Sequence, residues 1–74
     1  MSRIIVEVQG GSVIAVYSDT EVSVTVVDRD VDGVDDTMVN RVFGGTAVLI
    51  PQEVEQNLEA VQEVEAILYG GGPR

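Results

Sequence analysis

The chain has 74 residues, and its thirteen Asp and Glu stand against four Arg, which gives a formal net charge of −9. It contains no Lys, His, Cys or Trp, so disulfides, thiolate metal sites and the usual catalytic bases and nucleophiles are missing. We therefore predict a protein that is not an enzyme and has no cofactor. Its charge repels nucleic acids and anionic membranes and attracts basic protein surfaces.

The size of the chain predicts one domain over residues 1–69, followed by a flexible Gly-rich tail over residues 70–74. No apolar stretch reaches the roughly 18 residues of a membrane span, and no signal peptide is visible. A cytoplasmic location is expected.

The chain opens with a predicted β-hairpin. Residues 3–8 alternate, and the predicted apolar face consists of Ile4, Val6 and Val8. Gly10 and Gly11 suit a tight turn, because both central positions of such a turn take a positive φ. Residues 13–17 then form the return strand.

A third strand is predicted over residues 22–27, with one apolar face made by Val22, Val24 and Val26. An acidic loop follows over residues 28–36. The next segment is ambiguous. It fits either a hairpin through Gly44-Gly45 or a short helix, and both lead into a strand over residues 46–50.

The last element is a predicted helix over residues 53–68, opened by Pro51 and ended by Gly70. Its apolar residues recur at steps of three and four: Val54, Leu58, Val61, Val64 and Leu68. Asn57 falls inside this apolar arc, and we interpret it as a satisfied polar residue at the edge of the core. The predicted fold is α+β. A three- to four-stranded antiparallel sheet, starting with the β-hairpin, carries one C-terminal amphipathic helix on one face.

The acidic loop holds five Asp in nine residues. Asp28, Asp30 and Asp32, followed by Gly33, resemble the start of an EF-hand calcium loop, in which spaced oxygens surround the cation. The match fails at the twelfth position, where Val39 stands in place of the bidentate Glu. Calcium binding by these three Asp is therefore the alternative interpretation, and no metal is the first.

The predicted helix carries a one-sign stripe of Glu55, Glu59 and Glu63 at steps of four. Each like-charge pair costs roughly 0.2–0.5 kcal/mol, and no Lys or Arg on this helix offsets that cost. A stripe of this kind either keeps a protein soluble or contacts a basic partner. We predict that loop and stripe together form a partner-binding surface of Asp28, Asp30, Asp32, Asp35, Asp36, Glu55, Glu59 and Glu63.

Such a surface would imitate nucleic acid only in part. Alternate Asp on an extended segment lie about 6.6 Å apart, whereas duplex DNA carries about one charge per 1.7 Å of axis.

Residues 4–19, with their strand, Gly-Gly turn and strand, resemble the opening of a group of small acidic bacterial proteins. Residues 26–36 are similar to the Asp-rich loop of the same group. These proteins occur on phages, plasmids and integrated elements, so the resemblance implies a mobile-element protein. By analogy with anti-CRISPR and anti-restriction proteins, it implies an inhibitor that acts as a DNA mimic on the basic surface of a nucleic-acid-handling complex. A structural module that forms a homodimer through unpaired strand edges is a further alternative.

Overall fold

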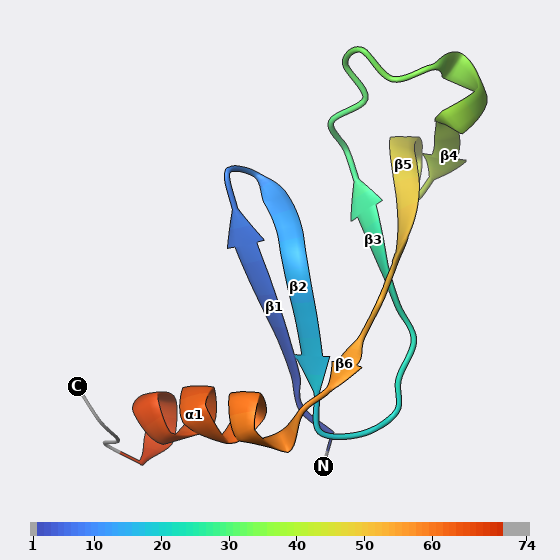
Figure 1. Ribbon diagram of the computed structural model, residues 1–74. Coiled ribbons are helices and arrows are strands. Elements are labelled where there is room, and N and C mark those ends of the chain that lie inside the picture. The colour runs from blue at the N-terminus through green and yellow to red at the C-terminus, as the bar shows by residue number, and fades with distance from the viewer. Residues whose placement is uncertain (1, 71–74) are drawn as a thin grey trace. The chain divides into compact units, whose positions relative to one another are not determined.

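The computed structural model describes residues 2–70 of the chain (Figure 1). These residues divide into two compact units. The hairpin–helix unit consists of Met1–Val22 and Glu53–Arg74, and the inserted unit consists of Ser23–Gln52. The prediction of one domain over residues 1–69 stays a prediction, and we describe each unit by itself.

The hairpin–helix unit contains strands β1 (Ile4–Gln9), β2 (Ser12–Ser18) and β6 (Glu55–Gln56), followed by helix α1 (Leu58–Tyr69). The strand order is β1-β2-β6; β1 and β2 are antiparallel, and the short β6 lies parallel to β2. The helix lies across one end of the β1–β2 hairpin (Figure 1).

The predicted first hairpin is confirmed. Gly10 and Gly11 have φ of 58° and 79°, a region that side chains disfavour and glycine tolerates. The prediction that the apolar face of β1 packs into the core is wrong. Its three residues are among the exposed apolar side chains, at 45%, 48% and 60% for Ile4, Val6 and Val8. β1 is an outer strand, its register shifts between Glu7 and Val8, and the helix covers only one end of the hairpin.

The buried residues of the hairpin–helix unit are few and lie on β2 and α1. Val16 and Val61 are each 2% exposed, and the Ser18 side chain is fully buried. Ser18 also joins three segments, because its carbonyl oxygen accepts from the Asn57 N–H at 2.9 Å and its Oγ accepts from the Thr20 N–H at 3.1 Å. One residue therefore ties the start of the helix to the end of the hairpin.

The inserted unit contains β3 (Val24–Asp28), a 3₁₀ turn η1 (Asp36–Met38), β4 (Asn40–Val42) and β5 (Gly45–Gln52). Its strand order is β3-β5-β4, and both pairings are antiparallel. Along β3 the predicted alternation is confirmed, with Val24 and Val26 half-buried and Thr25 exposed.

The predicted α+β class, with its initial hairpin and C-terminal helix, is confirmed, but the strands form two three-stranded sheets. β3 pairs with β5 rather than with the first hairpin.

In the ambiguous segment after the acidic loop the hairpin alternative is confirmed, because β4 and β5 pair there. The short-helix alternative is wrong, and the one helical turn nearby is η1 at Asp36–Met38. The hairpin turn lies one residue earlier than predicted, at Phe43-Gly44, with φ of 53° and 81°. Phe43 is the one non-glycine residue with positive φ among residues 2–70.

The helix starts at Leu58, five residues later than predicted, and Pro51 belongs to β5 instead of opening it. Pro51 pairs with Thr25, while β4 pairs only with residues 45–47 of β5. The proline thus stands where β5 has a single neighbour, a position at which a strand tolerates the missing N–H.

Asn57 is the N-cap of α1, where its Oδ1 accepts from the Ala60 N–H at 3.0 Å. The predicted satisfied polar residue is thus a helix cap. Gly70 ends the helix as predicted, with φ of −102° and its N–H donating to the Ala66 carbonyl oxygen.

Within residues 2–70 no helix combines the length and the apolar character needed to cross a bilayer. The rest of the predicted tail, residues 71–74, lies outside the described residues.

Candidate protein-binding surfaces

The eight predicted partner-binding residues are divided between the two units. The five Asp of the loop belong to the inserted unit, and Glu55, Glu59 and Glu63 belong to the hairpin–helix unit. We therefore describe the local structure of each acidic group by itself. Their combined role in partner binding stays a prediction.

The loop carboxylates mainly accept hydrogen bonds from the loop's own backbone. The Asp28 Oδ1 accepts from the Asp30 N–H at 2.9 Å, and the Asp30 Oδ1 accepts from the Asp32 N–H at 3.3 Å. The Asp35 Oδ1 accepts from both the N–H and the Oγ1–H of Thr37, each at 2.9 Å. Asp side chains that bond two residues ahead favour turns, so these Asp shape the loop.

The hydrogen bonds from Thr37, first from its backbone and then from its side chain, lower the pKa of Asp35 below the ordinary value of 3.8. Both bonds go to Oδ1, and they stabilise the ionised form because a charged carboxylate oxygen is a stronger acceptor than that of a neutral carboxyl group.

Calcium binding by Asp28, Asp30 and Asp32 stays a prediction. Within residues 2–70 no group of three or more Asp, Glu, His or Cys is arranged so that it could hold a metal ion. Two of these three carboxylates accept hydrogen bonds from backbone N–H groups two residues further on.

The predicted helical stripe is wrong in one member. Glu55 belongs to β6, and only Glu59 and Glu63 lie on α1. Glu55 instead accepts a 2.6 Å hydrogen bond at its Oε2 from the Nδ2 of Asn57.

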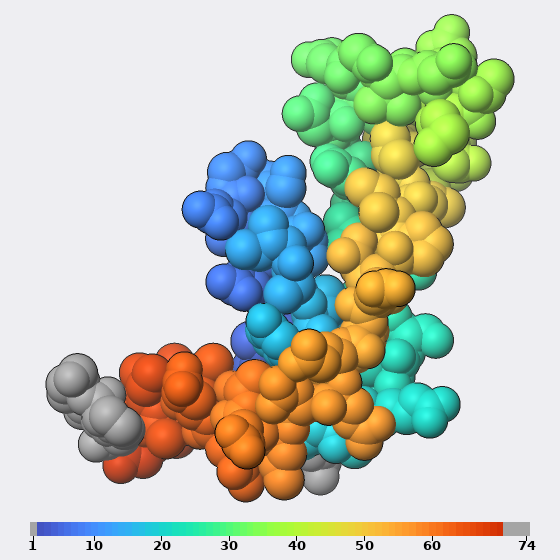
Figure 2. Space-filling view, viewed as in Figure 1, coloured from blue at the N-terminus to red at the C-terminus, as the bar shows by residue number. Residues whose placement is uncertain are grey.

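A groove in the hairpin–helix unit brings Glu7 together with Glu55 and Glu63, two members of the predicted stripe. It has a volume of about 610 Å³, and its lining comes from β1, β2, β6 and α1. Its apolar lining residues are Ile5, Val6, Tyr17, Ala60 and Val64, and its polar ones are Glu7, Glu55, Asn57 and Glu63. In Figure 2 the hairpin, in blue, and the helix, in orange and red, meet at an open angle.

The sheet register explains why these side chains meet. Ile5 is paired with Tyr17, and Tyr17 is paired with Glu55, so the three form one row across β1, β2 and β6. Residues that lie opposite each other in neighbouring strands point to the same face, and Glu7 follows Ile5 on that face at a step of two. The alternation in the sequence placed Ile5 on the same face as Glu7, but it did not explain why an apolar residue stands on a polar face. The groove explains it, because Ile5 is part of its apolar lining.

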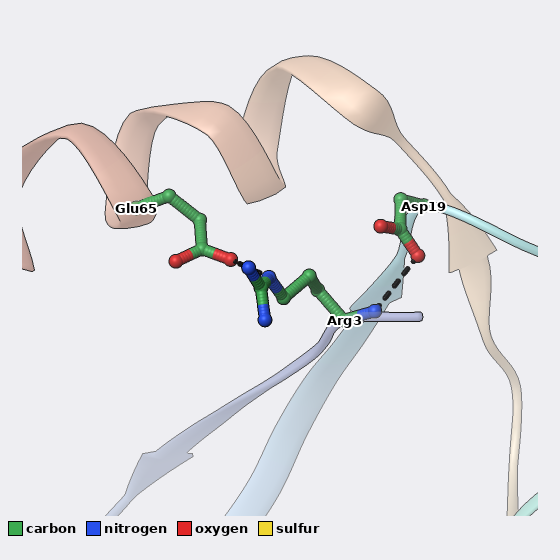
Figure 3. A network of polar contacts seen from close by, with 3 residues as sticks. All are labelled: Arg3, Asp19 and Glu65. Atoms are coloured by element: carbon green, nitrogen blue, oxygen red, sulfur yellow. Dashed lines mark hydrogen bonds and ion pairs between the residues drawn. The ribbon is translucent and has the colours of Figure 1, made fainter. Parts of the chain in front are cut away.

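The described cation of this unit, Arg3, is engaged outside the groove. Its guanidinium forms an ion pair with Glu65 of α1, and its backbone N–H donates to the Asp19 Oδ1 at 2.9 Å (Figure 3). Arg3 and Glu65 are absent from the residues that line the groove. This ion pair joins the residue before β1 to the helix.

Comparison of the chain with protein-family models, with curated proteins and with solved structures gave no match. The surfaces are therefore interpreted from their own geometry, and the resemblance to small acidic mobile-element proteins stays a prediction. Homodimer formation also stays a prediction. The outer strands of the two sheets are β1 and β6 in one and β3 and β4 in the other.

Proposed function

We propose that this protein is a non-enzymatic acidic module that binds basic surfaces of other proteins. The supporting observation is that both units have excess carboxylates. The hairpin–helix unit holds eight carboxylates against Arg3 and Arg74, and the inserted unit holds five against Arg29 and Arg41. A field of one sign over both units raises the association rate with a basic partner and disfavours acidic ones.

The narrower proposal is a mobile-element inhibitor of the anti-CRISPR or anti-restriction type. It would act in the cytoplasm as a DNA mimic that covers the basic groove of a nucleic-acid-handling complex. The charge and the resemblance of residues 4–19 and 26–36 to mobile-element proteins support this proposal.

Displacement of a fluorescent DNA duplex from bacterial nucleases and CRISPR effector complexes tests the proposal. We expect the wild-type protein to release the duplex at low salt and to lose this activity at high salt, because screening weakens contacts between exposed charges. The double variant Asp30→Arg with Asp32→Arg tests the loop as a contact surface. If it displaces the duplex as well as the wild type does, the loop is not the contact, and failure of the wild type on every such complex contradicts the inhibitor proposal.

A further inference from the structure

We propose that the groove between β1, β6 and α1 binds a cationic amphipathic segment of the partner protein. This inference rests on the proposed function and assigns its contact to one place in the hairpin–helix unit. The sequence predicted a contact made by the acidic loop together with Glu55, Glu59 and Glu63. The groove keeps Glu55 and Glu63, adds Glu7 and leaves out the loop.

The apolar lining makes the groove a place where a partner would gain by burying its own apolar side chains. Ile5, Tyr17, Ala60 and Val64 line it and are half-buried, so part of each side chain is open to a partner. Removing such apolar surface from water favours binding. A segment that was only polar or only charged would leave this part of the groove unused.

The acidic residues of the groove select a cationic segment. Glu7, Glu55 and Glu63 are all exposed and come from three different elements. They line the groove from β1, β6 and α1, so a bound segment would meet carboxylates of all three elements. Lys or Arg side chains suit this arrangement, because their apolar stems pack on the lining while their charged ends reach carboxylates at the rim.

The negative charge of the protein also disfavours three other occupants of the groove: a second copy of the chain, a nucleic acid and an anionic lipid surface. A second copy of this chain brings its own formal charge of −9 to the groove. Nucleic acids and anionic lipid surfaces are repelled for the same reason. A basic, amphipathic protein segment is the occupant that satisfies both the apolar lining and the three carboxylates.

The test uses the full-length protein and a synthetic amphipathic helix of Lys and Leu, of about 14 residues, which spans roughly 21 Å. Backbone amide NMR titration maps the contact, and fluorescence anisotropy of the labelled peptide gives the Kd. A scrambled peptide of the same composition and an oligolysine of equal length are the peptide controls. We expect shifts centred on β1, β6 and α1, and weaker binding of both control peptides.

Two matched double variants then separate the groove from the loop, since each removes two negative charges. Glu7→Gln with Glu63→Gln changes the groove, and Asp30→Asn with Asp32→Asn changes the loop. The groove variant should lose two exposed ion pairs with the peptide, which corresponds to about a tenfold weaker Kd. The loop variant should change the Kd by less than about twofold. Ala60→Phe keeps the charge and fills the groove, and it should also weaken binding in a protein whose circular dichroism is unchanged.

Equal weakening by the two double variants, or equal binding of the oligolysine and the amphipathic peptide, would overturn the groove assignment. So would a wild-type protein that binds none of the peptides. None of these outcomes decides the proposed function, because the displacement of DNA duplexes from nucleases and CRISPR effector complexes tests it separately. If displacement succeeds while the groove variant binds peptide like the wild type, only the groove assignment is lost.

Discussion

The two units use the same type of residue in different ways. In the inserted unit, Asp28, Asp30 and Asp35 accept hydrogen bonds from N–H groups two residues ahead, so their charge is combined with a local structural role. In the hairpin–helix unit, Glu7 and Glu63 are brought together from separate elements to line a groove. Local spacing therefore explains the first group, and tertiary packing creates the second.

The units also differ in what they bury. The hairpin–helix unit buries Val16, Ser18 and Val61, whereas Ala47 is the buried residue of the inserted unit among the described residues. We therefore expect mutations to lower the free energy of unfolding most where the helix meets the hairpin.

Truncation of Val61 should have the largest effect on stability. Val61→Ala removes two methyl-sized groups from a side chain that is 2% exposed, and we expect a loss of about 2 kcal/mol in the free energy of unfolding. Val26→Ala is the matched change at a half-buried position of the inserted unit and should cost less. Urea denaturation of both variants measures the difference, and equal costs would contradict the contrast between the units.

Loss of the helix cap should have the next largest effect. Asn57→Ala removes the acceptor of the Ala60 N–H and should cost about 1 kcal/mol, measured by thermal or urea unfolding. Asn40→Ala is its control, because the exposed Asn40 side chain donates only a 3.3 Å bond to the Met38 carbonyl oxygen. The control should stay within about 0.5 kcal/mol of the wild type. A cap variant as stable as the control would show that tertiary packing alone holds the start of α1.

The β4–β5 turn should be stabilised by a better turn residue. Phe43 has a φ of 53° and is 86% exposed, so it adopts a disfavoured backbone conformation with little packing in return. Phe43→Asn creates the Asn-Gly pair that two-residue hairpins prefer, and unfolding experiments should show a gain of about 0.5–1 kcal/mol. Phe43→Ala keeps the disfavoured φ and should give no gain. If both variants gain equally, removal of the exposed ring is the cause.

The smallest effect concerns the titration of Asp35. Hydrogen bonds from Thr37 lower the pKa of Asp35 below 3.8 in the folded protein. The ionised Asp35 therefore contributes to stability in full at pH values above 3.8, and this contribution is lost as the pH falls through the lower pKa of the folded protein. Thr37→Val removes the side-chain bond and should raise this pKa toward its ordinary value, while the backbone bond remains. Carboxyl NMR titration of the wild type and variant measures the shift, and an unchanged pKa would mean that the Oγ1 bond is not formed in solution.

Local patterns in the sequence were enough for the first hairpin, the alternation of β3 and the existence of the C-terminal helix. Gly10-Gly11 fixes a turn through backbone conformation alone, and the period of the apolar residues identifies the helix. The helix start was missed because Pro51 and the residues after it match a helical N-terminus, whereas in the structure β5 continues its pairing with β3 to Gln52. A strand pairing between distant segments overrides such a local signal.

The sequence by itself determined the charge, the lack of Lys, His and Cys, and the α+β class, because these follow from composition and from periods of a few residues. Only the tertiary structure decided that the strands form two sheets and that Glu7, Glu55 and Glu63 line one groove. The three Glu are up to 56 positions apart in the chain, and their meeting depends on strand register and on where the helix packs, neither of which is encoded in neighbouring residues.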